Sequence, residues 1–259
     1  MVEIIRKMKV SIITPTSNSA RTIQSNLDSI KNQSFKDYQL IVIDNNSTDE
    51  TVEIIKKNNL PNVKFLIEKD RGIFDAINKG IRMSDNEVIS VLHSDDLYNN
   101  KNVLKDIIET FQEHKDNDIV YGDLIYVKKD NIDITIRHWK PGPYSKNLFF
   151  KGWHPPHPSF FAKKKLFENH GYYAINNGNC ADVELMFRFL NIHNLKSKYL
   201  NKTLVKMRYG GASNKNVVSI IKQNIQIIKF LKIHKNYYKI SIFILYKILD
   251  RLKQFVFKE

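Results

Sequence analysis

The sequence predicts an α/β fold with a mostly parallel central sheet flanked by helices, followed by a C-terminal helical extension. Two observations carry this prediction. Within the first hundred residues, four runs of β-branched and apolar residues alternate with helical patterns across short loops. From residue 216 onward, the pattern of apolar residues is helical only. Alternation of strands and helices in this way is typical of a parallel sheet with right-handed crossovers.

The four predicted strands occupy residues 10–13, 40–43, 63–67 and 88–92. The first helix between them would bury Ile23, Leu27 and Ile30, which share one helical face. The second helix follows residues 47–50, a Ser-Thr-Asp-Glu run with the spacing of a capping box. The third helix passes through Ala76 and leads into the last of the four strands.

After the fourth strand the pattern changes. A helix near residues 102–111 precedes two alternating segments with a charged turn between them, which predict a pair of antiparallel strands at 119–127 and 132–139. An aromatic, proline-rich loop, a short strand, a helix and a last strand are then expected at residues 153–158, 159–162, 182–190 and 203–209. Residues 210–213 are a candidate hinge or lid.

Polar residues follow each of the first four strands. These are Thr14 and Thr16, then Asp44, then Asp70 with Arg71, and finally Asp95 with Asp96. The carboxyl ends of parallel strands meet at one edge of a sheet, where ligands bind, so four polar ends in succession predict a nucleotide site. Neither a dinucleotide-binding glycine motif nor a P-loop motif follows the first strand, which argues against those two kinds of site.

Asp95 and Asp96 are adjacent carboxylates, which repel each other unless a cation or strong hydrogen-bond donors lie between them. Hard oxygen ligands of this kind suit Mg²⁺ or Mn²⁺, whose coordination is usually completed by substrate phosphates. The alternative is a solvated turn in which one of the two residues caps the next helix. Both interpretations stay open on this stretch alone.

The net charge of +14 favours anionic partners such as nucleotides, nucleic acid or acidic lipid. Cys180, the only cysteine, excludes an internal disulfide framework and fits a reducing compartment. We find no signal peptide and no apolar run long enough to span a bilayer, so a cytoplasmic location is expected.

Residues 216–259 form a basic extension in which nine Lys and Arg stand against Asp250 and Glu259, a balance of +7. Its densest apolar run, residues 240–246, is bracketed by lysines and is too short to cross a bilayer. Two interpretations stay open: amphipathic helices on an anionic membrane surface, or a helical pair packed on the preceding domain.

Several segments are similar to the motifs of one family. Residues 11–16 resemble its opening strand, 44–49 its acidic Ser-Thr-Asp motif and 72–80 its third-helix signature, while 93–96 and 181–185 fall where it has a metal-binding Asp-x-Asp motif and a Glu-Asp pair before a helix. From residue 9 to 213 the chain therefore resembles a family 2 nucleotide-sugar glycosyltransferase of the GT-A type, as found in bacterial surface-polysaccharide synthesis. It departs at His93 and Ala181, where the family usually has acidic residues.

The resemblance implies an inverting enzyme that uses Mn²⁺ or Mg²⁺ and moves a sugar from a nucleoside-diphosphate donor, expected to be a UDP-sugar. The acceptor would be a hydroxyl of a glycan or lipid-linked glycan. One domain over residues 1–215 would contain a donor half, 1–98, and an acceptor half, 99–215. Asp182 would be the catalytic base, with Asp95 and Asp96 as metal ligands. The implied donor-binding residues are Thr14, Pro15, Thr16, Asp44, Asp70, Arg71, Asp95 and His157.

Structural alternatives stand beside these roles. Arg71 either faces the nucleotide or forms a surface ion pair with Asp70, and His157 either contacts a ligand or is a packed loop residue. Asp182 would otherwise cap its helix. The two departures leave open a catalytically inactive relative that binds nucleotide-sugar or carbohydrate. Nucleic-acid binding would rest on net charge alone, so no nucleic-acid partner is expected.

Overall fold

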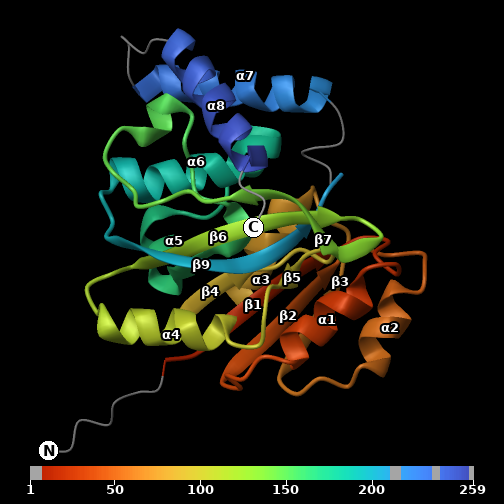
Figure 1. The fold of residues 1–259 in the computed structure, drawn as a ribbon. Coiled ribbons are helices and arrows are strands. Elements are labelled where there is room, and N and C mark those ends of the chain that lie inside the picture. The colour runs from red at the N-terminus through yellow and green to blue at the C-terminus, as the bar shows by residue number, and fades with distance from the viewer. Residues whose placement is uncertain (1–7, 211–216, 235–239, 257–259) are drawn as a thin grey trace, which may run out of the picture.

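The computed structural model describes residues 8–210, 217–234 and 240–256; the predicted hinge at 210–213 lies outside them apart from Gly210. The described chain forms a nine-stranded mixed sheet with helices on both faces (Figure 1). Its order is β3-β2-β1-β4-β8-β6-β9-β5, and β7 pairs with β6. The α/β class is therefore confirmed, although the sheet is mixed in its second half.

Four parallel strands form the first half of the sheet: β1 Val10–Thr16, β2 Tyr38–Asp44, β3 Val63–Ile67 and β4 Val88–Val91. The helices that connect them are α1 Ile23–Lys31, α2 Thr51–Lys57 and α3 Ile73–Met83. Because all four strands run the same way, their carboxyl ends lie along one edge, as the sequence predicted.

The predicted capping box is wrong. Helix α2 begins at Thr51, with Glu50 at the N-cap and no side-chain cap. The Ser47 backbone N–H instead donates to the Asp44 carboxylate, and the Ser47 hydroxyl accepts from the backbone N–H of Asn18. The Ser-Thr-Asp-Glu run thus joins the loops after β1 and β2.

The second half of the sheet is mostly antiparallel, and the predicted hairpin is confirmed in β6 and β7. Strand β4 pairs with β8, which pairs with β6, and β9 runs parallel to β6. The elements are β5 Leu97–Tyr98, α4 Val103–Glu113, β6 Ile119–Lys128, β7 Asn131–Trp139, β8 Phe160–Lys163, α5 Lys164–His170, α6 Ala181–Phe187 and β9 Ser197–Arg208. Short 3-10 turns occur at Leu148–Lys151 (η1), His157–Ser159 (η2) and Ile175–Cys180 (η3), and a π-helical turn at Arg188–Ile192 (η4) follows α6.

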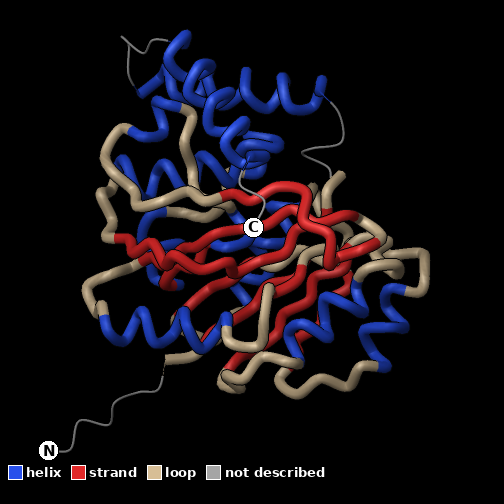
Figure 2. The backbone as a smooth tube through the Cα atoms, in the orientation of Figure 1, coloured by secondary structure: helices blue, strands red, loops and turns tan. Residues whose placement is uncertain are grey.

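Two hydrophobic cores cover the two faces of the sheet. Ile12 and Ile13 on β1 point into different cores, as the alternation of a strand requires. The first core, which contains Ile13, includes residues of α3, α5 and α6, and the second includes α1 and α4. Figure 2 shows the resulting order of layers, with helices above and below the strands. Gly80 lets α3 approach β1 closely, because a Cβ there would lie 2.5 Å from Ile13 Cγ2.

The C-terminal helices α7 Val217–His234 and α8 Ile240–Val256 lie against the first core. Ile227, Leu231 and Phe243 are buried there, and α8 packs on β7 and η1. This arrangement corresponds to the first-domain packing that the sequence analysis gave as one of two interpretations of residues 216–259. None of the described helices is long and apolar enough to span a membrane.

Helix α8 is polar toward the protein and apolar toward solvent. Lys247, Arg251 and Gln254 lie on the inward side with the buried Phe243. The outward side exposes Ile242, Ile244, Leu245, Tyr246, Ile248, Leu249 and Leu252. This orientation is the reverse of an ordinary surface helix, whose apolar side faces the core.

Candidate active site

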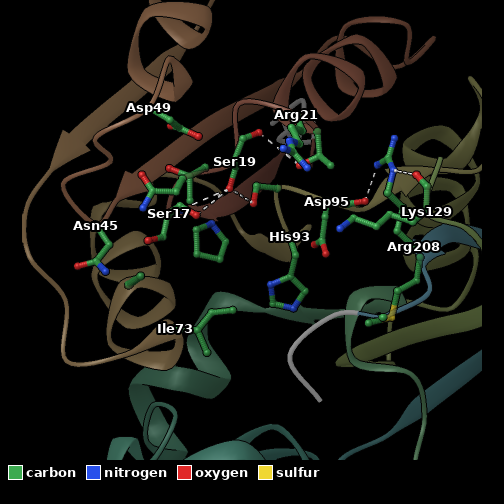
Figure 3. Close-up of a pocket in the computed structure, with 18 of the residues that line it drawn as sticks. Ser17, Ser19, Arg21, Asn45, Asp49, Ile73, His93, Asp95, Lys129 and Arg208 are labelled. Carbon is green, nitrogen blue, oxygen red and sulfur yellow. Dashed lines mark hydrogen bonds between the residues drawn. The ribbon is translucent and has the colours of Figure 1, made fainter. Parts of the chain in front are cut away.

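A cavity of about 550 Å³, called here the first cavity, opens at the carboxyl ends of the parallel strands. Its lining includes four residues from the predicted strand ends, Pro15, Thr16, Asp70 and Asp95, together with Asn45. Figure 3 shows His93 and Asp95 near its middle, between a side with Ser17 and Asn45 and a side with Lys129 and Arg208.

Hydrogen bonds between loops hold the wall that follows β1. The backbone N–H of Ser19 donates to the Thr51 hydroxyl at 2.7 Å, and that of Ala20 donates to Asp49 at 3.1 Å. The hydroxyls of Ser19 and Ser94 lie 2.8 Å apart. These contacts tie the loops after β1, β2 and β4 together, which fixes the shape of this wall.

Asp95 and Asp96 differ in environment. Asp95 lines the cavity, whereas Asp96 is 0% exposed, lies outside the lining, and neither of its carboxylate oxygens has a hydrogen-bond partner among the described residues. Burial and the neighbouring Asp95 raise the pKa of Asp96 well above its usual value. The Asn26 amide donates to the backbone oxygens of His93 and Asp96, at 2.9 and 2.8 Å, and so fixes this turn.

Two other predicted donor residues are buried behind the residues that line the cavity. Thr14 and Asp44 are fully buried and do not line it. Asp44 accepts the Ser47 backbone N–H at 3.0 Å, which shapes the β2 loop, and Thr14 Oγ1 has no hydrogen-bond partner within the described part of the chain. Asn45, which the sequence reasoning passed over, stands at the cavity in place of Asp44.

Asp70 and Arg71 do not pair with each other, which was the structural alternative to a nucleotide-facing Arg71. Asp70 pairs with Lys79 at 2.7 Å, and Arg71 pairs with Asp75 at 3.0 Å, one helical turn away. Both partners lie on α3, which begins directly after this loop. The Arg71 side chain is 75% exposed and does not line the cavity, whereas Asp70 does.

The sequence analysis did not predict the cationic side of the first cavity. Lys129 follows β6, and Arg208 ends β9 and donates to the backbone oxygens of Asp95 and Lys129, at 2.6 and 3.3 Å. Arg21 adds a third cation from the β1 side. The net charge of +14 was the only signal in the sequence for these residues, and it does not say where they gather.

A second cavity of about 160 Å³ adjoins the first, because His93 and Met207 line both. Asp182, in the first turn of α6, contributes to its lining, and its Oδ1 has no hydrogen-bond partner among the described residues. Burial raises the pKa of Asp182 to about 6, while the charge of Lys247 acts in the opposite direction. The carboxylate is therefore mostly ionised at neutral pH and has a proton affinity suited to general-base catalysis.

The histidines between the cavities are neutral and packed. His157 Nε2 lies 2.8 Å from the Tyr173 hydroxyl, its ring faces His93, and burial lowers its pKa to about 3. It lines the second cavity and not the first. Cys180, next to α6, has a pKa raised to about 11 by burial, so its thiol is unreactive at neutral pH.

Comparisons with known proteins show the family of the chain. The family profile described as Glycosyl transferase family 2 matches residues 11–171. A PGL/p-HBAD biosynthesis glycosyltransferase of Mycobacterium tuberculosis is 30% identical over 211 residues, covering 79% of this chain and 78% of that protein. The poly(ribitol-phosphate) beta-N-acetylglucosaminyltransferase TarP of Staphylococcus aureus is 35% identical over 206 residues, covering 75% of this chain and 54% of TarP.

Solved structures share the fold. The crystal structure of S. aureus TarS 1-349 in complex with UDP superposes with a TM-score of 0.63 at 21% identity, covering 85% of this chain and 64% of that one. The mannosyltransferase PcManGT from Pyrobaculum calidifontis, in complex with GDP-Man and Mn²⁺, gives a TM-score of 0.64 at 16% identity, covering 86% and 63%. The chain thus spans somewhat less than two thirds of each of these two structures.

Proposed function

Because the chain belongs to glycosyl transferase family 2, we propose that it moves a sugar, with inversion, from a UDP-sugar to a hydroxyl of a glycan or lipid-linked glycan in surface-polysaccharide synthesis. One observation carries the proposal: two adjoining cavities that meet at His93, one with Asp95 and the other with Asp182 in its lining. The complexes of TarS with UDP and with UDP-GlcNAc support the donor, and the name of TarP supports the acceptor class.

The donor would occupy the first cavity. Asn45 and Thr16 lie where a nucleoside could bind, and Arg21, Lys129 and Arg208 supply positive charge for the diphosphate. The donor roles expected of Arg71 and His157 are not part of the proposal, because both side chains lie outside this cavity. Thr14 and Asp44 are buried and do not line this cavity, so no direct donor contact is proposed for them.

A divalent ion fits this cavity only together with the donor. The described residues contain no group of three or more His, Cys, Asp or Glu that could hold a metal by itself. Asp95 offers one carboxylate, and Mg²⁺ or Mn²⁺ commonly binds one or two carboxylates and completes its shell with substrate phosphates. Such an ion would neutralise charge on the departing diphosphate. Asp96 would have to turn out of the core to join it.

Asp182 is the proposed general base. It would take the proton of the acceptor hydroxyl as the hydroxyl oxygen bonds to the anomeric carbon, and the bond from that carbon to the diphosphate oxygen would break with its electron pair leaving on UDP. One base on the side opposite the leaving group is sufficient for inversion. Its lining position and a pKa of about 6 support this role.

The test is a panel of UDP- and GDP-sugars, assayed by thermal shift and for slow donor hydrolysis with Mn²⁺ or with EDTA. We expect one UDP-sugar to stabilise the protein in Mn²⁺ and to be hydrolysed. Binding without any hydrolysis or transfer would favour the inactive relative, and stabilisation by RNA rather than nucleotide would overturn both functions.

We further propose that the enzyme works at the cytoplasmic face of the membrane as a peripheral protein. The exposed apolar side of α8 and the +7 balance of residues 216–259 support attachment to an anionic bilayer. Apolar contact and charge attraction would then act on the same helix.

A further inference from the structure

Three cationic side chains gather in the second cavity, a feature that the family resemblance did not suggest. Arg137 comes from β7, while Lys247 and Arg251 come from α8, one helical turn apart. The carboxylates in the same lining are those of Asp182 and Asp250, so the formal charge of the lining is positive by one. Asp250 is exposed and accepts a hydrogen bond from Gln254 at 2.8 Å.

The three positive charges in this lining repel one another. The charge of Arg251 lowers the pKa of both Arg137 and Lys247, adding to the larger effect of burial, and the pKa of Lys247 falls to about 8. Arg137 is only 5% exposed, and its guanidinium lies 3.9 Å from the centre of the Tyr126 ring. An anion bound among these three side chains would offset their mutual repulsion.

The ammonium group of Lys247 is available to bind an anionic ligand. Within the described residues its ammonium makes no ion pair or hydrogen bond, and it lies 5.2 Å from the centre of the Phe243 ring. The charges of Asp182 and Asp250 act on it from a greater distance and raise its pKa, against the larger effect of burial. Its stem packs at Gly152, where an added Cβ would lie 3.1 Å from Lys247 Cβ. The stem is thus held in place while the ammonium, which lines the cavity, lacks a counter-ion in direct contact.

We propose that Arg137, Lys247 and Arg251 form a subsite for a phosphate group of the acceptor, beside the hydroxyl that Asp182 activates. The inference rests on the proposed function and adds the acceptor's chemical class: a phosphate-bearing glycan or polyol. Guanidinium and ammonium donors together suit phosphate oxygens. The donor's diphosphate has its own cations, Arg21, Lys129 and Arg208, in the first cavity.

The phosphate could belong to a polyol-phosphate polymer or to a lipid diphosphate, and both present the same oxygens to this subsite. We would therefore titrate two probes calorimetrically into the full-length protein saturated with UDP and Mn²⁺: glycerol 3-phosphate for the polymer and farnesyl diphosphate for the lipid. The stronger binder identifies the source. Binding is measured directly, so the test does not depend on turnover.

Lys247→Met keeps the packed stem and removes the charge, and Lys253→Met is the matched control, because Lys253 is exposed on the same helix. We expect Lys247→Met to weaken the better probe roughly tenfold to hundredfold, the range for a lost hydrogen bond to a charged group. Lys247→Arg should retain most of the affinity, and the control and UDP affinity should be unchanged. If Lys247→Met does not fold, Arg251→Gln serves the same comparison.

Three results would overturn the subsite: equal probe affinity in wild type and Lys247→Met, competition between the probe and UDP, or loss of UDP affinity in Lys247→Met, which would assign the cations to the donor. Failure of the proposed function looks different. A protein that binds no nucleotide, or binds it without hydrolysing any nucleotide-sugar, could still bind the phosphate probes, and its charge variants would still report on the subsite.

Discussion

The charged groups that line the two cavities differ in their partners and in their pKa values. In the first cavity several charged groups are held by partners: Asp70 pairs with Lys79, Asp49 accepts two backbone N–H groups, and Arg208 donates to two backbone oxygens. In the second cavity Asp182 and Lys247 are desolvated, and their pKa values shift toward neutrality, to about 6 and about 8. Groups whose pKa values lie near neutrality suit proton transfer, which distinguishes the second cavity from the first.

The sharpest test of this comparison is Asp182→Asn. Asparagine fills the same space but cannot accept the proton, so we expect kcat to fall by about 10²–10⁴. UDP affinity and the thermal unfolding transition should stay close to wild type, since Cys180 and not Asp182 occupies the N-cap of α6. A variant that retains most of the wild-type transfer rate would show that the base lies elsewhere.

On the donor side, Asp95→Asn should lower turnover by about 10²–10³, the typical loss when one charge-stabilising group is removed. UDP affinity should fall in Mn²⁺ and change little in EDTA, because the carboxylate acts through the ion. Asp96→Asn is the matched comparison, as a buried neighbour that does not line the cavity. Equal effects of the two variants on the Mn²⁺ dependence would make both residues metal ligands.

The pH dependence of transfer separates the cavities further. The folded pKa of Asp182 is raised to about 6, so the carboxylate is ionised above that pH and protonated below it. The rate should therefore fall about tenfold per pH unit below pH 6, the behaviour of a general base. Affinity for the UDP-sugar, whose diphosphate has no terminal phosphate to titrate near pH 6, should be nearly flat over the same range. A rate that stays constant down to pH 5 would contradict a base with this pKa.

The fold and the first cavity could be predicted because their signals are local. Each strand of the first half is a short apolar run, and its polar end follows within a few residues, so the sequence alone assigns Thr16, Asp70 and Asp95 to one edge of the sheet. The sequence did not separate side chains that line the cavity from buried ones such as Thr14 and Asp44. It also did not show that Asp70 and Arg71 pair with residues of α3, which follows this loop.

The second cavity could be predicted only at Asp182, because its other groups come from distant segments. Arg137 lies on a hairpin, and Lys247 and Arg251 lie on a helix that the sequence presents as a separate extension. Apolar periodicity normally identifies the buried side of a helix. In α8 that rule gives the wrong side, since its apolar residues face solvent and its cations face the cavity.

Substitutions on the outward side of α8 should have the smallest effects on stability and nucleotide binding. Leu245 and Leu249 are 55% and 46% exposed, so Leu245→Ser with Leu249→Ser should change the free energy of unfolding by only about 0.5 kcal/mol per site. UDP affinity should not change. Attachment to phosphatidylglycerol vesicles should fall, because the two side chains would no longer enter the bilayer interface.

The same attachment has an electrostatic part that salt can measure. Each basic residue near an anionic surface contributes about 1 kcal/mol within a Debye length, so binding should weaken as salt is added and should be poor on neutral phosphatidylcholine vesicles. Lys253→Gln, on the same exposed helix, should reduce this salt dependence and leave the apolar contact intact. If the double serine variant instead dissociates a dimer and vesicle binding is absent in the wild type, the apolar side of α8 is an interface between two copies of the chain.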